Sequence, residues 1–205
     1  MSLEIYITFL SASFLLWITP GQDTMYIIAR SISQGKLAGI VSALGIGTGG
    51  LVHALLATAG VSIIILTSPI LFLMMKVVGG LYLIYLGIST LFLKSKIKAN
   101  ESMKDSKFSK IYMQGVLTNI LNPKVALFFI AFLPQFLNTS TDTKSILFLG
   151  LSFVIGGTIW CLIVAWFASS FSLKLRQSSS IQTWFTKISA FVYIALGLKV
   201  LQAKV

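Results

Sequence analysis

Long apolar runs separated by short polar joints make up most of the chain. A membrane-spanning helix needs about 20 mainly apolar residues, each adding about 1.5 Å of length. Six runs meet this requirement, at residues 3–29, 38–66, 69–93, 111–137, 145–172 and 184–202. We therefore predict an all-α membrane protein with six transmembrane helices. The first run has no basic segment before it and no small-residue cleavage site, so we interpret it as a retained helix and not as a signal peptide.

One joint is much longer than the others. It covers residues 94–110 and reads KSKIKANESMKDSKFSK. This Lys-rich linker divides a single transmembrane domain, residues 1–205, into a three-helix repeat at 1–93 and another at 111–205. Because three is an odd number of spans, the second repeat enters the membrane from the opposite side. Inverted repeats of this kind are typical of secondary transporters.

Lys and Arg are distributed unevenly between the two sides of the predicted membrane. If the N-terminus lies outside, eleven basic residues flank the inner side: Arg30, Lys36, Lys94, Lys96, Lys98, Lys104, Lys107, Lys110, Lys174, Arg176 and Lys187. The outer side then receives only Lys144, Lys199 and Lys204. Since basic residues concentrate on the cytoplasmic side, both termini are predicted outside and the linker at 94–110 inside.

Composition excludes several classes of protein. The chain is 56% hydrophobic and only 10% charged, whereas a soluble domain carries about a quarter charged residues. The net charge of +11 suggests nucleic acid at first, but the basic residues lie between apolar runs, where they act as topology signals beside membrane lipid. We therefore expect no nucleic-acid partner. A single cysteine, Cys161, excludes a disulfide framework and a cysteine-based metal site, and we expect no metal or cofactor.

The two repeats share three features in the same order. Each has a helix break, then a glycine cluster, then a Tyr…Leu-Gly ending. The breaks are at 19–21 and 122–123, the glycine clusters at 45–50 and 150–157, and the endings at 82–87 and 193–197. The matched order supports two inverted three-helix repeats.

Each break carries the signal of a new helix start. Thr19, with Gln22 three residues later, forms a capping box that places Pro20 at the first helical position. Asn122 is likewise a helix cap followed by Pro123. Helical rise puts both breaks about 15–20 Å from the inner flank, near the middle of a core about 30 Å thick. We therefore predict that helices 1 and 4 are broken near the midplane. Two positive helix N-termini would converge there, which suits a carboxylate.

Ionisable residues adjoin these breaks. A charge at this depth costs about 2.5–3.5 kcal/mol, so it usually has a partner or a function. We interpret Asp23 as the receptor of an amine or a proton, and Lys124 as that of a carboxylate. In the alternative, Asp23 complements its own helix dipole, and Lys124 snorkels or pairs with a backbone carbonyl. Straight helices place Lys124 about 10 Å further outward than Asp23, so no direct bridge is predicted. His53 is either a proton carrier or a neutral packing histidine.

Several of these blocks together resemble the LysE/RhtB family of amino-acid exporters. The resemblance rests on residues 20–23, 30–39, 44–47, 52–53, 76–87 and 122–136, and it covers essentially the whole chain. It implies a small permease of a prokaryotic cytoplasmic membrane that exports amino acids or their derivatives, coupled to the proton-motive force. The family substrates range over lysine, arginine, threonine, homoserine and leucine.

The family's PG-x-D and NPK motifs match six residues of this chain, which the resemblance assigns to substrate binding: Pro20, Gly21, Asp23, Asn122, Pro123 and Lys124. Two positions depart from the family pattern. Gln22 stands where a second proline is frequent, and Gly50 stands where many members carry an aspartate. A proton relay built on that aspartate does not carry over, which leaves Asp23 and His53 as candidates for proton coupling.

The leading hypothesis is secondary export of an amino acid by alternating access. The alternative is efflux of another small solute, a cation or a metabolite, by the same architecture. An intramembrane enzyme is not predicted, because the ionisable residues lie at three depths and no HExxH or GxSxG motif is present. Gly45-x-x-x-Gly49 fits close helix packing, either within the bundle or between the subunits of a homodimer.

Overall fold

The computed structural model describes residues 2–67, 69–92, 106–137 and 142–170, with six further residues between 187 and 198. Every element within these ranges is helical. The elements are α1 (Leu3–Ile18), α2 (Gln22–Gln34), α3 (Lys36–Thr67), α4 (Pro69–Phe92), α5 (Phe108–Ile120), α6 (Pro123–Leu127), the π-helical turn η2 (Phe128–Phe132), the 3₁₀ turn η3 (Leu133–Phe136) and α7 (Thr143–Ser170).

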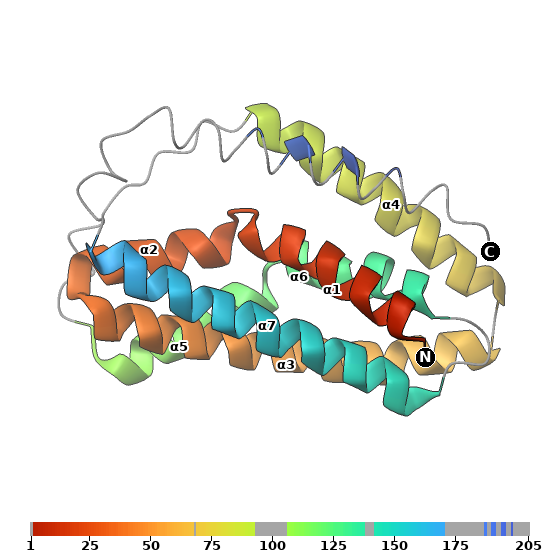
Figure 1. Cartoon of the computed structure of the whole chain (residues 1–205), viewed down its shortest axis with the longest axis horizontal. Coiled ribbons are helices and arrows are strands. Elements are labelled where there is room, and N and C mark those ends of the chain that lie inside the picture. The colour runs from red at the N-terminus through yellow and green to blue at the C-terminus, as the bar shows by residue number, and fades with distance from the viewer. Residues whose placement is uncertain are drawn as a thin grey trace.

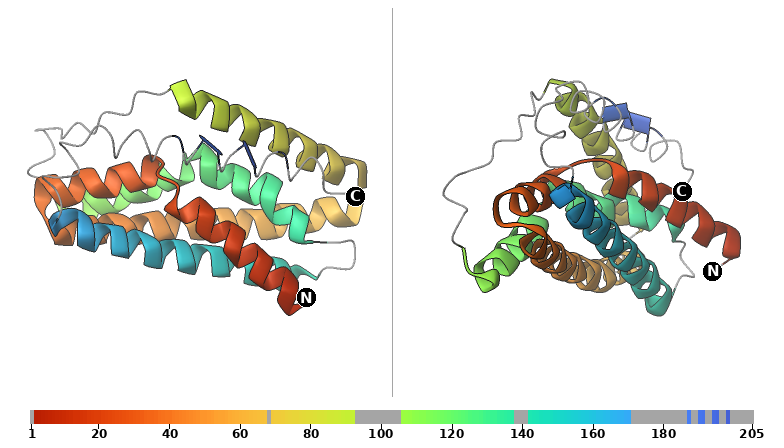
Figure 2. Two further views of the ribbon diagram at one scale, coloured as in Figure 1. Left: turned by 45° about the horizontal axis from the view of Figure 1, so that its top comes forward. Right: turned by 60° about the vertical axis from the view of Figure 1, so that its left-hand side comes forward.

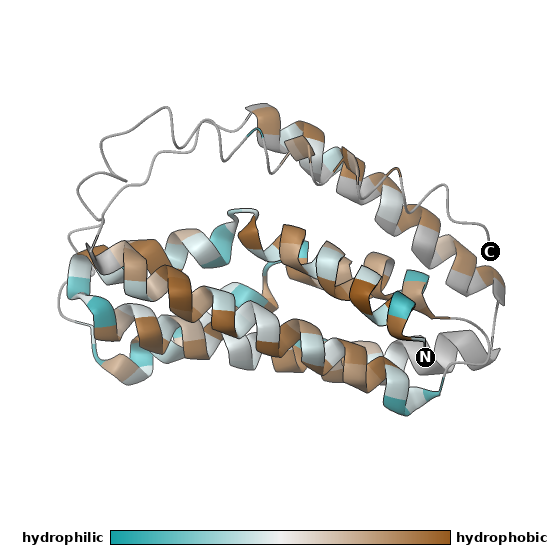
Figure 3. Ribbon diagram, viewed as in Figure 1, coloured by the Kyte–Doolittle hydropathy of each residue, from teal (hydrophilic) through white to brown (hydrophobic). Residues whose placement is uncertain are grey.

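The described residues contain two to four candidate membrane spans. Lys36–Gly60 of α3 and Thr143–Ala168 of α7 are each long and apolar enough to cross a membrane alone. The α1–α2 pair, bent by 50°, and the pair of α5 with Pro123–Phe136, bent by 45°, qualify if each pair is one broken span. Figure 3 shows hydrophilic residues at helix ends and at the α1–α2 bend, and hydrophobic residues over most of the remaining length. The predicted sixth span at 184–202 lies almost wholly outside the described residues.

The long helix α3 forms the centre of the bundle. α3 packs against α5 on one side and α7 on the other, while α2 contacts α3, α5 and α7. α1 lies along α7, and α4 packs on the π-helical turn η2 (Figures 1 and 2). An aromatic cluster fills the space between α1, η2 and α7, where the rings of Phe128 and Phe153 stack with centroids 3.7 Å apart. Tight packing there fixes α1 against α7 beside the first break.

The predicted glycine packing occurs inside the bundle, between α3 and α5. A Cβ built on Gly45 would overlap the carbonyl oxygen of Tyr112, and one on Gly49 would lie 2.7 Å from the Cβ of Asn119. On the facing helix, a Cβ on Gly115 would likewise collide with the α3 backbone. These glycines therefore let two backbones approach closely. Because this face is used within the chain, it lends no support to a homodimer.

The first helix break lies where it was predicted, but its cap differs. α1 ends at Ile18, and α2 is capped by Gly21 with no side-chain hydrogen bond. The Thr19 hydroxyl donates to the carbonyl oxygen of Leu15 at 2.7 Å. The predicted capping box is therefore wrong, because the threonine side chain bonds back into the turn that precedes it. Consequently Pro20 lies in the link between the helices and not at the first helical position.

The second break matches its prediction closely. The Asn122 side chain accepts a hydrogen bond from the Lys124 backbone N–H at 3.0 Å, and Pro123 occupies the first turn of α6. Figure 1 places both breaks near mid-length of the bundle, with α2 and α6 running from there toward opposite ends. The helix starts that follow the two breaks are therefore neighbours.

Candidate functional site

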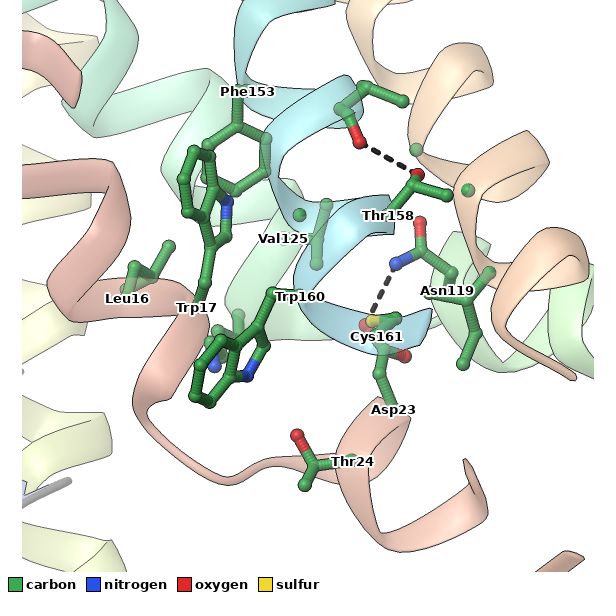
Figure 4. Close-up of a pocket in the computed structure, with 16 residues that line it drawn as sticks. Leu16, Trp17, Asp23, Thr24, Asn119, Val125, Phe153, Thr158, Trp160 and Cys161 are labelled. Carbon is green, nitrogen blue, oxygen red and sulfur yellow. Dashed lines mark hydrogen bonds between the residues drawn. The ribbon is translucent and has the colours of Figure 1, made fainter. Parts of the chain in front are cut away.

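A small pocket lies beside the two breaks, between α1, α2, α3, α5, α6 and α7 (Figure 4). Its cavity of about 60 Å³ has room for roughly four water molecules, since one water needs about 10–15 Å³. Five polar side chains line it: Asp23, Thr24, Asn119, Lys124 and Thr158. The other lining side chains are mainly apolar and include Leu16, Trp17, Val125, Phe153, Val154 and Trp160.

Asp23 lies in the first turn of α2 and has one oxygen bonded and one open. Its Oδ2 accepts a hydrogen bond from the Asn119 side-chain amide at 2.8 Å. Its Oδ1 is buried without a hydrogen-bond partner among the described residues. The Asn122 amide interacts favourably with this carboxylate, yet its Nδ2 reaches no acceptor at hydrogen-bond distance. A buried carboxylate oxygen without a partner is costly, so this atom is suited to receive a donor from a ligand.

Lys124 approaches the same place from the other break. Its Nζ donates to the backbone carbonyl of Thr19 at 2.5 Å, and a Cβ on Gly21 would lie 3.4 Å from its Cδ. The backbone-carbonyl alternative is therefore the contact observed. The bends at both breaks bring Lys124 and Asp23 to one pocket, although straight helices would separate them in depth. Their charges attract each other there, while no hydrogen bond joins them directly in the described structure.

His53 on α3 is connected to Asp23 through a single residue, Asn119. Its Nε2 is 3.1 Å from the backbone carbonyl oxygen of Asn119, and its ring stacks on Phe129 with centroids 6.0 Å apart. It is not among the side chains that line the pocket. Asn119 thus contacts His53 through its backbone and Asp23 through its side chain.

Comparison with known proteins identifies the family. The model of the LysE type translocators matches residues 14–204, which is nearly the whole chain. The chain belongs to the LysE translocator family. Members of this family are transporters and not enzymes, and amino-acid export is the activity supported at the family level.

Three named relatives are similar to this LysE translocator over most of its length. The membrane protein YrhP of Bacillus subtilis (strain 168) is 31% identical over 192 residues, covering 89% of this chain and 91% of the relative. The leucine efflux protein of Salmonella typhimurium is 28% identical over 144 residues, covering 70% of this chain and 68% of the relative. The Salmonella typhi leucine efflux protein matches to the same extent. No solved structure matches the chain.

The residues that the sequence singles out in this translocator divide by position. Asp23 and Lys124 line the pocket. Gly21 packs against Lys124, and Asn122 caps α6 while its side chain lies near Asp23. Pro20 lies in the link between α1 and α2, Pro123 is the first residue of α6, and neither is among the lining residues.

Asn119 and Trp17 were not identified from the sequence. Asn119 is only 4% exposed and holds Asp23, although an isolated polar residue one turn before a break gives little indication of its partner. Trp17 lies one turn before the other break, and its indole Nε1 is buried without an acceptor among the described residues. Both residues place a polar side-chain atom next to a helix break in an apolar span, and this is the sequence feature that could have identified them.

A second polar cluster ties α2 to α5 at the end of the bundle away from α1. Arg30 is 2% exposed and donates to the side-chain oxygens of Gln34, at 2.6 Å, and of Gln114. The Gln34 amide donates in turn to the Ser106 carbonyl at 3.2 Å. The sequence pattern indicates Arg30 only as a basic residue flanking a span. The structure instead buries it in a contact between the first and second halves of this translocator.

Proposed function

We propose that this translocator is a secondary-active exporter of amino acids that works by alternating access and is driven by the proton-motive force. The observation that carries the proposal is the presence of Asp23 and Lys124 at one pocket, each beside a different helix break. An acid and a base with little solvent around them match the two charges of a zwitterion.

Each charged group of an amino acid finds a suitable partner in this pocket. The open Oδ1 of Asp23 accepts from the substrate ammonium, while the Lys124 ammonium binds the carboxylate. The first turn of α2 adds its positive helix end, because Gly21 caps that helix without a side chain. The substrate carboxylate competes with the Thr19 carbonyl for Lys124, so binding loosens the contact between the two breaks.

Alternating access follows from the origin of these residues. Asp23 belongs to the first half, residues 1–93, and Lys124 to the second, residues 111–205. We propose that the two halves are inverted three-helix repeats that rock against each other about the pocket, with both termini outside. The opposite directions of α2 and α6 in Figure 1 support this symmetry.

Proton coupling is assigned to Asp23, with His53 as the second candidate residue. A carboxyl that binds either a proton or the substrate ammonium links the two fluxes by competition. Contact of both residues with Asn119 supports a connection between them.

The test is efflux of preloaded labelled amino acids from bacterial cells that lack their own exporters. Wild type, Asp23→Asn and an empty vector are compared across a panel of about twenty amino acids, with leucine first because of the leucine efflux relatives. We expect wild type alone to accelerate efflux of one or a few amino acids. Equal efflux by an inserted Asp23→Asn variant would overturn the assigned role. If a correctly inserted wild type moves no amino acid, export of a cation or another metabolite takes precedence.

A further inference from the structure

The apolar wall of the pocket contains a contact between a large and two very small residues. Trp17, near the end of α1, lies directly on Gly156 and Gly157 of α7. A Cβ on Gly156 would overlap the six-membered ring of the indole. A Cβ on Gly157 would lie 3.1 Å from Nε1 and 3.3 Å from Cδ1 of the same side chain. The ring is therefore as close to α7 as the absence of side chains permits.

This contact decides how far the indole extends into the cavity. Both Trp17 and Gly157 line the pocket, and Figure 4 shows the indole beside Phe153 on the side away from Asp23. The ring centroids of Trp17 and Phe153 are 5.7 Å apart. A methyl group on Gly157 would push Trp17 by a few tenths of an ångström. In a cavity of only about 60 Å³, such a shift changes the available space appreciably.

Asp23 lies on the side of the pocket away from Trp17, whereas the Lys124 ammonium is bonded to the carbonyl of Thr19, two residues after Trp17. Among the described lining residues, Asp23 and Lys124 are the charged ones, and the proposed function assigns both to the substrate backbone. A substrate side chain that extends toward Trp17 meets Leu16, Val125 and Phe153 instead. Because the substrate carboxylate occupies Lys124, a charged side chain placed there would be desolvated without a partner of its own.

We propose that Trp17, seated on Gly157, is the specificity-determining residue of the pocket and restricts the substrate to amino acids with an uncharged, apolar side chain of limited size. The inference rests on the proposed function, because it takes the pocket as the substrate site. One methylene more or less in an apolar pocket changes selectivity about 10-fold or more. Small changes at these two residues should therefore alter the substrate range.

The test measures counterflow of alanine, leucine, phenylalanine and lysine by the purified full-length chain in liposomes. Gly157→Ala moves the ring inward, so we expect the leucine-to-alanine ratio of Vmax/KM to fall about 10-fold. Trp17→Leu shortens the wall, so the phenylalanine-to-alanine ratio should rise by a similar factor. Lysine should remain a poor substrate of all variants.

Gly60→Ala is the matched control, because a Cβ on Gly60 would have no atom of the described residues within 4 Å. It should leave both ratios unchanged. Vmax/KM that falls equally for every substrate in Gly157→Ala and Trp17→Leu would indicate packing alone and overturn the inference. Unchanged ratios in both variants, or lysine transported as well as leucine by wild type, would also overturn it. If Gly157→Ala does not fold, Trp17→Leu alone decides: a rise in its phenylalanine-to-alanine ratio of Vmax/KM supports the inference, and an unchanged or lower ratio overturns it. If wild type transports no amino acid, the proposed function itself is wrong. This result differs from the outcomes above, in which transport occurs but its selectivity does not change as expected.

Discussion

The Lys124 ammonium donates a hydrogen bond to the backbone carbonyl of Thr19, so that the second helix break holds the first. The carbonyl belongs to Thr19, the residue that caps the C-terminus of α1, where the break removes the usual helical donor. A side chain at the start of α6 thus supplies a donor that α1 lacks. The same ammonium faces the pocket that contains Asp23.

Lys124→Met is expected to lower both stability and transport. The substitution keeps the length of the side chain but leaves the Thr19 carbonyl without its donor and Asp23 without a nearby positive charge. A hydrogen bond to a charged group contributes about 1.5–3 kcal/mol, so the free energy of unfolding should fall by about that amount. Thermal unfolding in detergent and efflux in cells measure the two effects. Lys124→Arg, which retains the charge, should recover part of the stability. Full transport by Lys124→Met would contradict the assigned role.

Asn119→Leu is expected to abolish most transport. Leucine has a similar size but cannot donate to Asp23, and both carboxylate oxygens would then be without a hydrogen bond from α5. An unsatisfied charged group costs about 1–3 kcal/mol or more, and we expect at least a 10-fold loss of efflux. Thr118→Ala is the control on the same helix, since among the described residues its hydroxyl bonds within α5, to the Gln114 carbonyl. Equal efflux by both variants would show that Asn119 is not needed.

Gly45→Ala is expected to destabilise the bundle. The added methyl group would overlap the Tyr112 carbonyl, and backbone atoms cannot yield as a flexible side chain can. Overpacking of this kind costs about 1–3 kcal/mol. Chemical denaturation of the purified protein measures the loss. Gly60→Ala again has open space around it and should cause no loss. If both variants are as stable as wild type, α3 and α5 are not packed as closely as described.

Gln114→Leu is expected to loosen α2 from α5. Arg30 loses an acceptor, and a hydrogen bond to a charged group contributes about 1.5–3 kcal/mol. The free energy of unfolding should fall by that amount, with little change in KM because the cluster does not line the pocket. Thermal unfolding and transport kinetics provide the two measurements. The control is Gln22→Leu at the exposed first residue of α2, which should be close to neutral. A rise in KM with unchanged stability would refute this separation of roles.

Asp142, just before α7, is expected to make stability depend on pH in acid. Hydrogen bonds from the Ser145 hydroxyl and backbone N–H hold the pKa of Asp142 below its usual value of 3.8. Because the pKa of Asp142 is lower in the folded state, its ionised carboxylate contributes fully to stability above pH 3.8. This contribution is lost as the pH falls through the pKa of the folded state. The difference in unfolding temperature between wild type and Asp142→Ala should therefore be constant near neutral pH and shrink in strong acid. Asparagine can also cap a helix but does not titrate. The difference in unfolding temperature between Asp142→Asn and Asp142→Ala should therefore not shrink in strong acid.

The breaks were predictable because their signals are local. Asn122 followed by Pro123 specifies a helix start whatever surrounds it, and the structure has that start. Thr19 followed by Pro20 looked equivalent, but the threonine hydroxyl had two acceptable partners, and the Leu15 carbonyl of the preceding turn is the one it bonds. Sequence alone does not rank two such hydrogen bonds.

The composition of the pocket was predictable only in part. Asp23 and Lys124 stood out as charges in apolar spans. Their common pocket depends on two bends, of 50° and 45°, which straight-helix arithmetic omits. The role of Asn119 depends on contacts with residues 96 and 66 positions away. Such partners follow from packing, and the chain contains no local pattern for them.

The separation of 96 residues between Asp23 and Asn119 also constrains how the protein is made. Ribosomes add about 5–20 residues per second, so the Asn119 amide is synthesised roughly 5–20 s after the carboxyl that it holds. During that interval α2 carries an acid without its eventual partners, at an insertion cost of about 2.5–3.5 kcal/mol. The nascent α2 is therefore expected to wait at the lipid headgroups or beside the insertion machinery. Final assembly of the first break becomes a late event in biogenesis, after α5 and α6 have entered the bilayer.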